Sequence, residues 1–156
     1  MDLATLWIPS AHDAFLRAQY RNALLAQGWR VGAWRKTEVS ALREGLTHAC
    51  LPTAAGTFFV PPDPFALAPF TAALSKAVDR PMLTVDDRAL TVYARGDVVA
   101  GFARWGSDPQ AVARALGVPP EEVAALLDAE GAQREGAPGD GARGEAWELT
   151  AFRMVG

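Results

Sequence analysis

The chain has 156 residues and a mass of 16.6 kDa, and half of its residues are hydrophobic. A chain of this size can bury roughly two-thirds of the surface that it exposes when unfolded, so we expect one compact domain over residues 1–156 and exclude a disordered chain. The net charge of −3 argues against a basic nucleic-acid-binding surface, and the single cysteine excludes a disulfide scaffold. No apolar run approaches the roughly 18 residues that a membrane span needs.

The first third of the chain predicts alternating strands and helices. Residues 3–8 form an apolar strand, and Ser10 is a good N-cap for the helix that follows. Apolar residues recur in that helix with a period close to that of an α-helix, and Gly28 occupies a typical C-terminal position. The segment 29–36 then alternates as a single strand would. Thr37 is predicted to cap a second helix, whose apolar face comprises Val39, Leu42 and Leu46.

The middle of the chain predicts a hairpin, a helix and an antiparallel meander. Short apolar runs at 48–51 and 57–60 flank a segment rich in turn-forming residues. Asp63 and Pro64 are a typical helix start, because a capping carboxylate precedes a proline at the first helical position. Pro69 is expected to split the helical region that follows. Three β-prone runs then form the meander, at residues 82–85, 89–94 and 98–105.

The last third predicts two short helices, a loop and a returning strand. The helices span 109–116 and 120–130, the Gly/Ala-rich loop spans 131–145, and the strand spans 146–155. This order predicts an α+β fold, with a mostly antiparallel mixed sheet, helices packed on one face and a short C-terminal helical hairpin. A subdivision near residues 61–64 is the alternative to a single domain.

The helical pair is similar in its spacing to a helix-turn-helix. Ala113 is small, Gly117 suits the turn four residues later, and Val123 and Leu126 would fill the angle between the helices. A helix that reads DNA carries polar and basic side chains, whereas this second helix begins with acidic residues such as Glu121. We therefore interpret the pair as a hairpin that caps the sheet.

The segment 29–36 combines aromatic and basic side chains. Alternation along a strand places Arg30 and Trp34 on one face, and Arg35 and Lys36 follow. Exposed tryptophan beside arginine is typical of protein–protein interfaces and of stacking platforms for single-stranded nucleic acid. We predict that Arg30, Trp34, Arg35 and Lys36 bind a protein partner. The alternatives are a single-stranded nucleic-acid site and a covered sheet face that includes Trp34.

His48 and Cys50 lie two residues apart on an expected strand, and therefore on one face. An imidazole can activate a thiol as a nucleophile, but neighbours at this spacing rarely meet in the required geometry. Because Cys50 lies in an apolar run, we interpret both residues as structural. Asp86 and Asp87 precede Arg88 and are interpreted as turn residues. The sequence has no phosphate-binding glycine loop and no nucleophile elbow, so we predict no catalytic residue, no cofactor and no metal site.

Charge and composition complete the prediction. Residues 1–48 hold six basic and four acidic residues, whereas residues 106–156 hold four basic and nine acidic ones. This charge difference favours attraction between the two ends, either within one chain or between the two chains of a homodimer. The basic residues are arginine except at Lys36 and Lys76, a composition typical of GC-rich bacterial genomes. No signal peptide is recognised, so the cytoplasm is the expected location.

The sequence therefore predicts a bacterial, non-catalytic module that binds another protein, as a regulator, an assembly factor or an immunity-type inhibitor. Two alternatives from other classes remain open. One is a single-stranded nucleic-acid binder that uses residues 29–36, and the other is a small ligand-binding domain or an enzyme without a recognisable motif.

Overall fold

The computed structural model describes residues 5–9, 12–38, 47–53, 56–62, 65–86, 89–103, 108–124 and 145–153. The helices in these ranges that have both ends described are α1 (Asp13–Ala26), α2 (Leu67–Val78) and α3 (Pro109–Leu116). The strands are β1 (Thr5–Ile8), β2 (Trp29–Val31), β3 (Arg35–Glu38), β4 (His48–Thr53), β5 (Gly56–Val60), β6 (Met82–Val85), β7 (Ala89–Ala94), β8 (Asp97–Ala103), β9 (Glu145–Leu149) and β10 (Ala151–Arg153).

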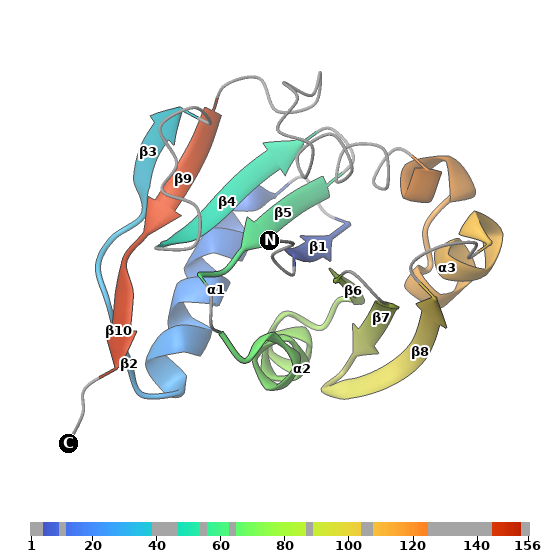
Figure 1. Cartoon of the computed structure of the whole chain (residues 1–156), viewed down its shortest axis with the longest axis horizontal. Coiled ribbons are helices and arrows are strands. Elements are labelled where there is room, and N and C mark those ends of the chain that lie inside the picture. Colours follow the sequence, from blue (N-terminus) through green and yellow to red (C-terminus); the bar gives the residue numbers. More distant parts are fainter. Residues whose placement is uncertain are drawn as a thin grey trace.

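An eight-stranded sheet forms the centre of the molecule (Figure 1), with the order β3-β9-β4-β5-β1-β6-β7-β8. Every pairing within the described ranges is antiparallel. The remaining strands, β10 and β2, pair with each other as a short separate ribbon. The predicted α+β class is confirmed, and so are the β4–β5 hairpin and the β6–β7–β8 meander.

Strand β1 lies in the middle of the sheet and is buried along its whole length. Its side chains alternate between two apolar clusters, because successive residues of a strand point to opposite faces. Leu6 and Ile8 belong to one cluster and Trp7 to the other. An apolar run without polar alternation is therefore what this central position requires.

Helices α1 and α2 cover the face that receives Leu6 and Ile8. In α1, the buried residues Leu16, Tyr20 and Leu24 are spaced four apart, which places them in one stripe along the helix. Pro69 does not split α2, contrary to the sequence prediction. It lies in the first turn, where a backbone amide has no intrahelical acceptor and its loss costs little.

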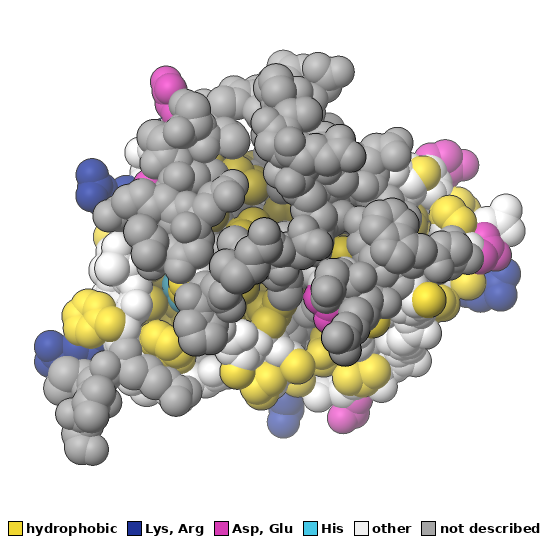
Figure 2. Space-filling model, viewed as in Figure 1, with side chains coloured by type: hydrophobic (Ala, Val, Ile, Leu, Met, Phe, Trp, Pro, Cys, Tyr) yellow, Lys and Arg dark blue, Asp and Glu magenta, His cyan; other side chains and the backbone are white. Residues whose placement is uncertain are grey.

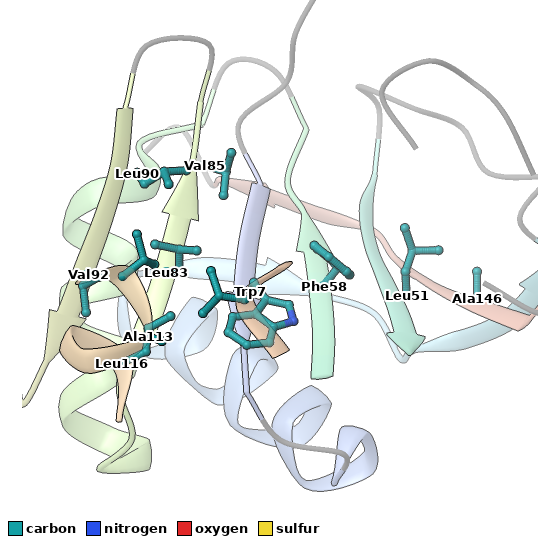
Figure 3. Packing of buried hydrophobic residues seen from close by; sticks show 12 residues of the cluster. Trp7, Leu51, Phe58, Leu83, Val85, Leu90, Val92, Ala113, Leu116 and Ala146 are labelled. Carbon is teal, nitrogen blue, oxygen red and sulfur yellow. The ribbon is translucent and has the colours of Figure 1, made fainter. Parts of the chain in front are cut away.

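The opposite face is covered by α3 and by the helical residues that follow it. Figure 3 shows the large Trp7 side chain among residues of β5, β6 and α3, all fully buried or nearly so. Gly117 ends α3 with a φ of 72°, and the chain is helical again at 120–124. Val123 is buried while Glu121 and Glu122 are exposed. The hairpin therefore packs its apolar side on the sheet, as expected, whereas Leu126 lies outside the described residues.

The predicted single strand over 29–36 is divided into β2 and β3. β2 pairs with β10, β3 pairs with β9, and the break lies opposite Thr150, whose carbonyl accepts the Gly32 amide at 3.0 Å. Thr37 lies inside β3 and not at a helix start. The rest of the helix predicted there falls on residues 39–46, outside the described ranges, as do Asp63, Pro64 and most of the 131–145 loop. None of the described helices is long and apolar enough to cross a membrane.

Candidate functional site

The ribbon of β2 and β10 presents an arginine and a phenylalanine side by side. Arg30 and Phe152 are direct cross-strand partners, so their side chains leave the same face of the ribbon. Both are exposed, and Phe152 retains 53% of its accessible surface. Figure 2 shows apolar and basic side chains next to each other at the left, where Figure 1 places β2 and β10. Sequence inspection missed Phe152, because only the pairing with β2 identifies its neighbour.

The other predicted binding residues divide between the two faces. Arg35 is exposed and pairs with Glu148, which alternation along β9 and β10 places on the Phe152 face. Lys36 is exposed but pairs with Trp147, on the opposite face. We call the set Arg30, Arg35 and Phe152 the ribbon face. Lys36 is not part of this set, because its side chain leaves the opposite face.

Trp34 is half-buried and fixes the chain where β2 passes into β3. Its indole Nε1 donates a hydrogen bond of 2.8 Å to the backbone carbonyl of Arg17 in α1. Its ring lies 5.8 Å from that of Tyr20 and 6.1 Å from that of Phe59, centroid to centroid. The side chain therefore packs against the α1 side of the core.

Trp29 holds the other end of β2 against the same core. Its ring is 5.6 Å from Phe65 and 6.5 Å from the imidazole of His48. The guanidinium of Arg21 in α1 donates a 2.8 Å bond to the Gly32 carbonyl. Trp29, Trp34 and Arg21 thus hold the ribbon, which contributes no strand to the main sheet, against the core. A binding surface held in one conformation loses less conformational entropy when its partner binds.

His48 is fully buried beneath this ribbon. Its Nδ1 is 2.6 Å from the hydroxyl of Tyr20, and its ring meets Phe65 edge to face at 4.9 Å. Its Nε2 has no hydrogen-bond partner among the described residues. Burial lowers the pKa of His48 to about 4 and raises the pKa of Tyr20 well above its usual range, since it disfavours both charged forms. The pair is therefore neutral at pH 7.

Removing the Tyr20 hydroxyl is expected to destabilise the fold by roughly 1–3 kcal/mol, the cost of leaving a buried acceptor or donor unpaired. Tyr20→Phe keeps the ring contacts with Phe59 and Phe70, so the loss isolates the hydrogen bond to His48. Urea unfolding at pH 7 measures it. Tyr93→Phe, in β7, removes a hydroxyl that is hydrogen-bonded to Thr84 and is the comparison for the loss of a tyrosine hydroxyl at a second site. An unchanged unfolding midpoint for Tyr20→Phe would show that the hydroxyl contributes nothing.

Cys50 shares the buried face with His48, but the two do not form a catalytic pair. The imidazole Nδ1 bonds Tyr20, and burial raises the pKa of the Cys50 thiol to about 12 despite the nearby Arg17 guanidinium, which lowers it. A thiol with that pKa is not a nucleophile at neutral pH. Arg17 is itself engaged by Asp13, in an ion pair, and by the ring of Trp147, 3.9 Å away.

Asp86 closes the β6–β7 turn, as expected. Its carboxylate accepts the Ala89 amide at 2.7 Å, and its own amide donates to the Ala89 carbonyl at 3.1 Å. Asp87 and Arg88 lie outside the described residues. Across the described ranges, His, Cys, Asp and Glu side chains nowhere gather in threes as a metal site would require.

Comparisons with protein-family models, with curated proteins and with solved structures found no match to this chain. The function therefore has to be inferred from the geometry of the chain itself.

Proposed function

We propose that this chain is a non-catalytic protein-interaction module and that its ribbon face binds the partner. The observation that carries the proposal is the exposed Arg30–Phe152 pair on a ribbon that two tryptophans fix to the core. Aromatic and arginine side chains dominate the energetics of protein interfaces, and a rigid strand loses little conformational entropy on binding. The cytoplasm is the proposed compartment.

The chemistry of the ribbon face favours a partner of a particular kind. Phe152 offers an apolar ring that fits a pocket, while Arg30 and Arg35 offer planar donors that match carboxylates. An apolar pocket bordered by Asp or Glu would satisfy all three side chains. The same side chains could stack on bases and bind phosphates, which keeps single-stranded nucleic acid as the second candidate.

Capture from a lysate separates the two candidates. The wild-type chain and the double variant Phe152→Ser, Arg30→Glu are each immobilised. Each is incubated with untreated lysate and with lysate that has been treated with nuclease. We expect a protein band that survives nuclease and is reduced at least about tenfold in the double variant, as hot-spot losses above 1.4 kcal/mol imply.

The control is Phe15→Ser on α1, because Phe15 is 50% exposed and so matches Phe152 in type and exposure. All three proteins should show the same thermal unfolding midpoint, which excludes misfolding as the cause. A band that persists in the double variant would contradict the proposal. Recovery of nucleic acid with affinity that falls steeply with salt would favour the second candidate.

A further inference from the structure

The two outer edges of the eight-stranded sheet differ in their chemistry. At one edge, β3 exposes the charged side chains of Arg35, Lys36 and Glu38. Charged side chains are a common means by which proteins prevent a sheet edge from pairing with another strand. At the other edge, β8 has one charged residue, Asp97 at its start, and the six residues that follow it are uncharged.

Strand β8 also exposes apolar side chains to solvent. Val98 and Val99 retain 61% and 54% of their accessible surface, and Ala103 is exposed at the far end. Among the described strands, only β7 pairs with β8. The outer backbone groups of β8 therefore have no strand partner within the described part of the chain.

A bulge at the start of β8 keeps both valines out of the core. Tyr93 pairs with Val98 and Val92 pairs with Ala100, so Val99 is the extra residue. From Ala100 to Ala103 the ladder with β7 is regular. Four regular residues and two exposed valines thus remain at this edge, and none of the six residues from Val98 to Ala103 is charged.

We propose that β8 is the interface of a homodimer, in which the β8 strands of two copies pair antiparallel across a twofold axis and join their sheets. A foreign strand is selected through pockets for its alternate side chains, and the small residues Ala100, Gly101 and Ala103 offer little to select with. A second copy needs only a self-complementary edge, and twofold dimers are the commonest oligomers.

The charges at the two ends of β8 favour this antiparallel partner. The β7–β8 turn carries Arg95, and α2 packs against that turn through the bond from the Gly96 amide to Ser75 Oγ at 3.1 Å. Exposed at this end are three basic and two acidic side chains: Lys76, Arg80 and Arg95, with Asp79 and Asp97.

The described residues at the opposite end of β8 are mostly acidic. Figure 1 shows α3 and the helical residues after it beyond the Ala103 end, away from the β7–β8 turn. Among the described residues, three exposed acidic side chains and one basic one lie there: Asp108, Glu121 and Glu122, with Arg114. Arg104, which follows Ala103, lies outside the described residues. Antiparallel pairing places the basic end of each copy beside the acidic end of the other. The contact is therefore attractive twice in each dimer, whereas a parallel arrangement would oppose like charges.

Sedimentation velocity of the full chain over a range of concentrations tests the proposal. We expect the wild type to pass from monomer to dimer with rising concentration and to stop at two copies. Val98→Lys together with Val99→Lys should remain monomeric, because two ammonium groups on each edge repel their counterparts. Both positions are exposed, so the fold should persist, with the unfolding midpoint of the dilute protein as the check. Phe15→Lys on α1 is the matched control and should dimerise as the wild type does.

A charge exchange tests the antiparallel orientation. The single variant Arg95→Glu should weaken dimerisation by roughly two- to fivefold, as expected for exposed charges. The double variant Glu121→Arg, Glu122→Arg should weaken it by a similar factor. The variant that combines all three substitutions should recover dimerisation, because the exchanged charges attract each other again. Three outcomes would each overturn the proposal. The wild type could stay monomeric at millimolar concentration, the lysine double variant could still dimerise, or species larger than a dimer could form. Ribbon-face variants should dimerise normally, because Arg35 lies in β3, at the other edge of the sheet, and β2 and β10 lie beside that edge (Figure 1).

Discussion

Gly56→Ala is expected to lower the free energy of unfolding by at least about 3 kcal/mol, as for severe overpacking of a core. Gly56 begins β5 with a φ of 151°, a conformation that side-chain-bearing residues rarely adopt. A Cβ there would lie 2.6 Å from the Ile8 carbonyl oxygen and 2.6 Å from the indole Nε1 of Trp7. Neither can move freely, because β1 is the buried centre of the sheet and Trp7 is fully buried.

Two other glycines separate the steric clash from the backbone strain. Gly117 has a φ of 72° but open space around its Cβ position, so Gly117→Ala should cost only about 1–2 kcal/mol of strain. Gly101 has ordinary backbone geometry and open space, so Gly101→Ala should change the stability by less than about 0.5 kcal/mol. The measurement is urea unfolding of all three variants at pH 7. A Gly56→Ala loss no larger than that of Gly117→Ala would show that β1 and β5 do not approach as closely as described.

The stability of the fold is expected to fall by roughly 3 kcal/mol through His48 alone as the pH drops from 7 to 4. Burial lowers the pKa of His48 from 6.5 to about 4 in the folded state. Between those two values the unfolded chain binds a proton that the folded chain excludes, so acidification favours unfolding and stability rises with pH. Each unit of pKa shift corresponds to 1.36 kcal/mol, and the effect should be complete near the folded pKa.

Carboxylates also titrate at low pH, so the measurement needs matched histidine variants. His48→Gln removes the titrating group while retaining a side chain that can bond Tyr20. Between pH 4 and 6.5, the free energy of unfolding of His48→Gln should depend less on pH than that of the wild type. This holds whatever the difference in their free energies of unfolding at pH 7. His12→Gln replaces the other histidine, which is exposed, and its stability is measured over the same pH range for comparison. Equal pH dependence in the wild type and His48→Gln would mean that His48 is not held neutral by burial.

The parts of the fold that could be predicted from sequence are those with local causes. The β7–β8 turn contains Arg95 and Gly96, both with positive φ, and the flanking runs alternate as paired strands do. The end of α3 at Gly117 likewise follows from glycine's tolerance of a left-handed conformation. In these segments the residues that determine the structure are neighbours in sequence.

The candidate site depends on contacts between distant parts of the chain, and so it was predicted only in part. Arg30 and Arg35 were predicted as binding residues and are exposed. Trp34 instead points toward α1, because its indole donates a hydrogen bond to the Arg17 carbonyl. The break between β2 and β3 coincides with Thr150, more than a hundred residues away, where the partner segment also passes from one sheet to the other. Phe152 became a candidate only once that pairing was known.

The central claim is that the ribbon face binds a protein. It is tested most directly by placing a photo-crosslinking phenylalanine analogue at position 152 of the full chain, with the same analogue at position 15 as the control, in the source cells. We predict a discrete protein adduct from position 152 that is missing from position 15 and is lost when Arg30→Glu is added. No adduct at position 152, equal adducts at both positions, or a nucleic-acid adduct would contradict the account.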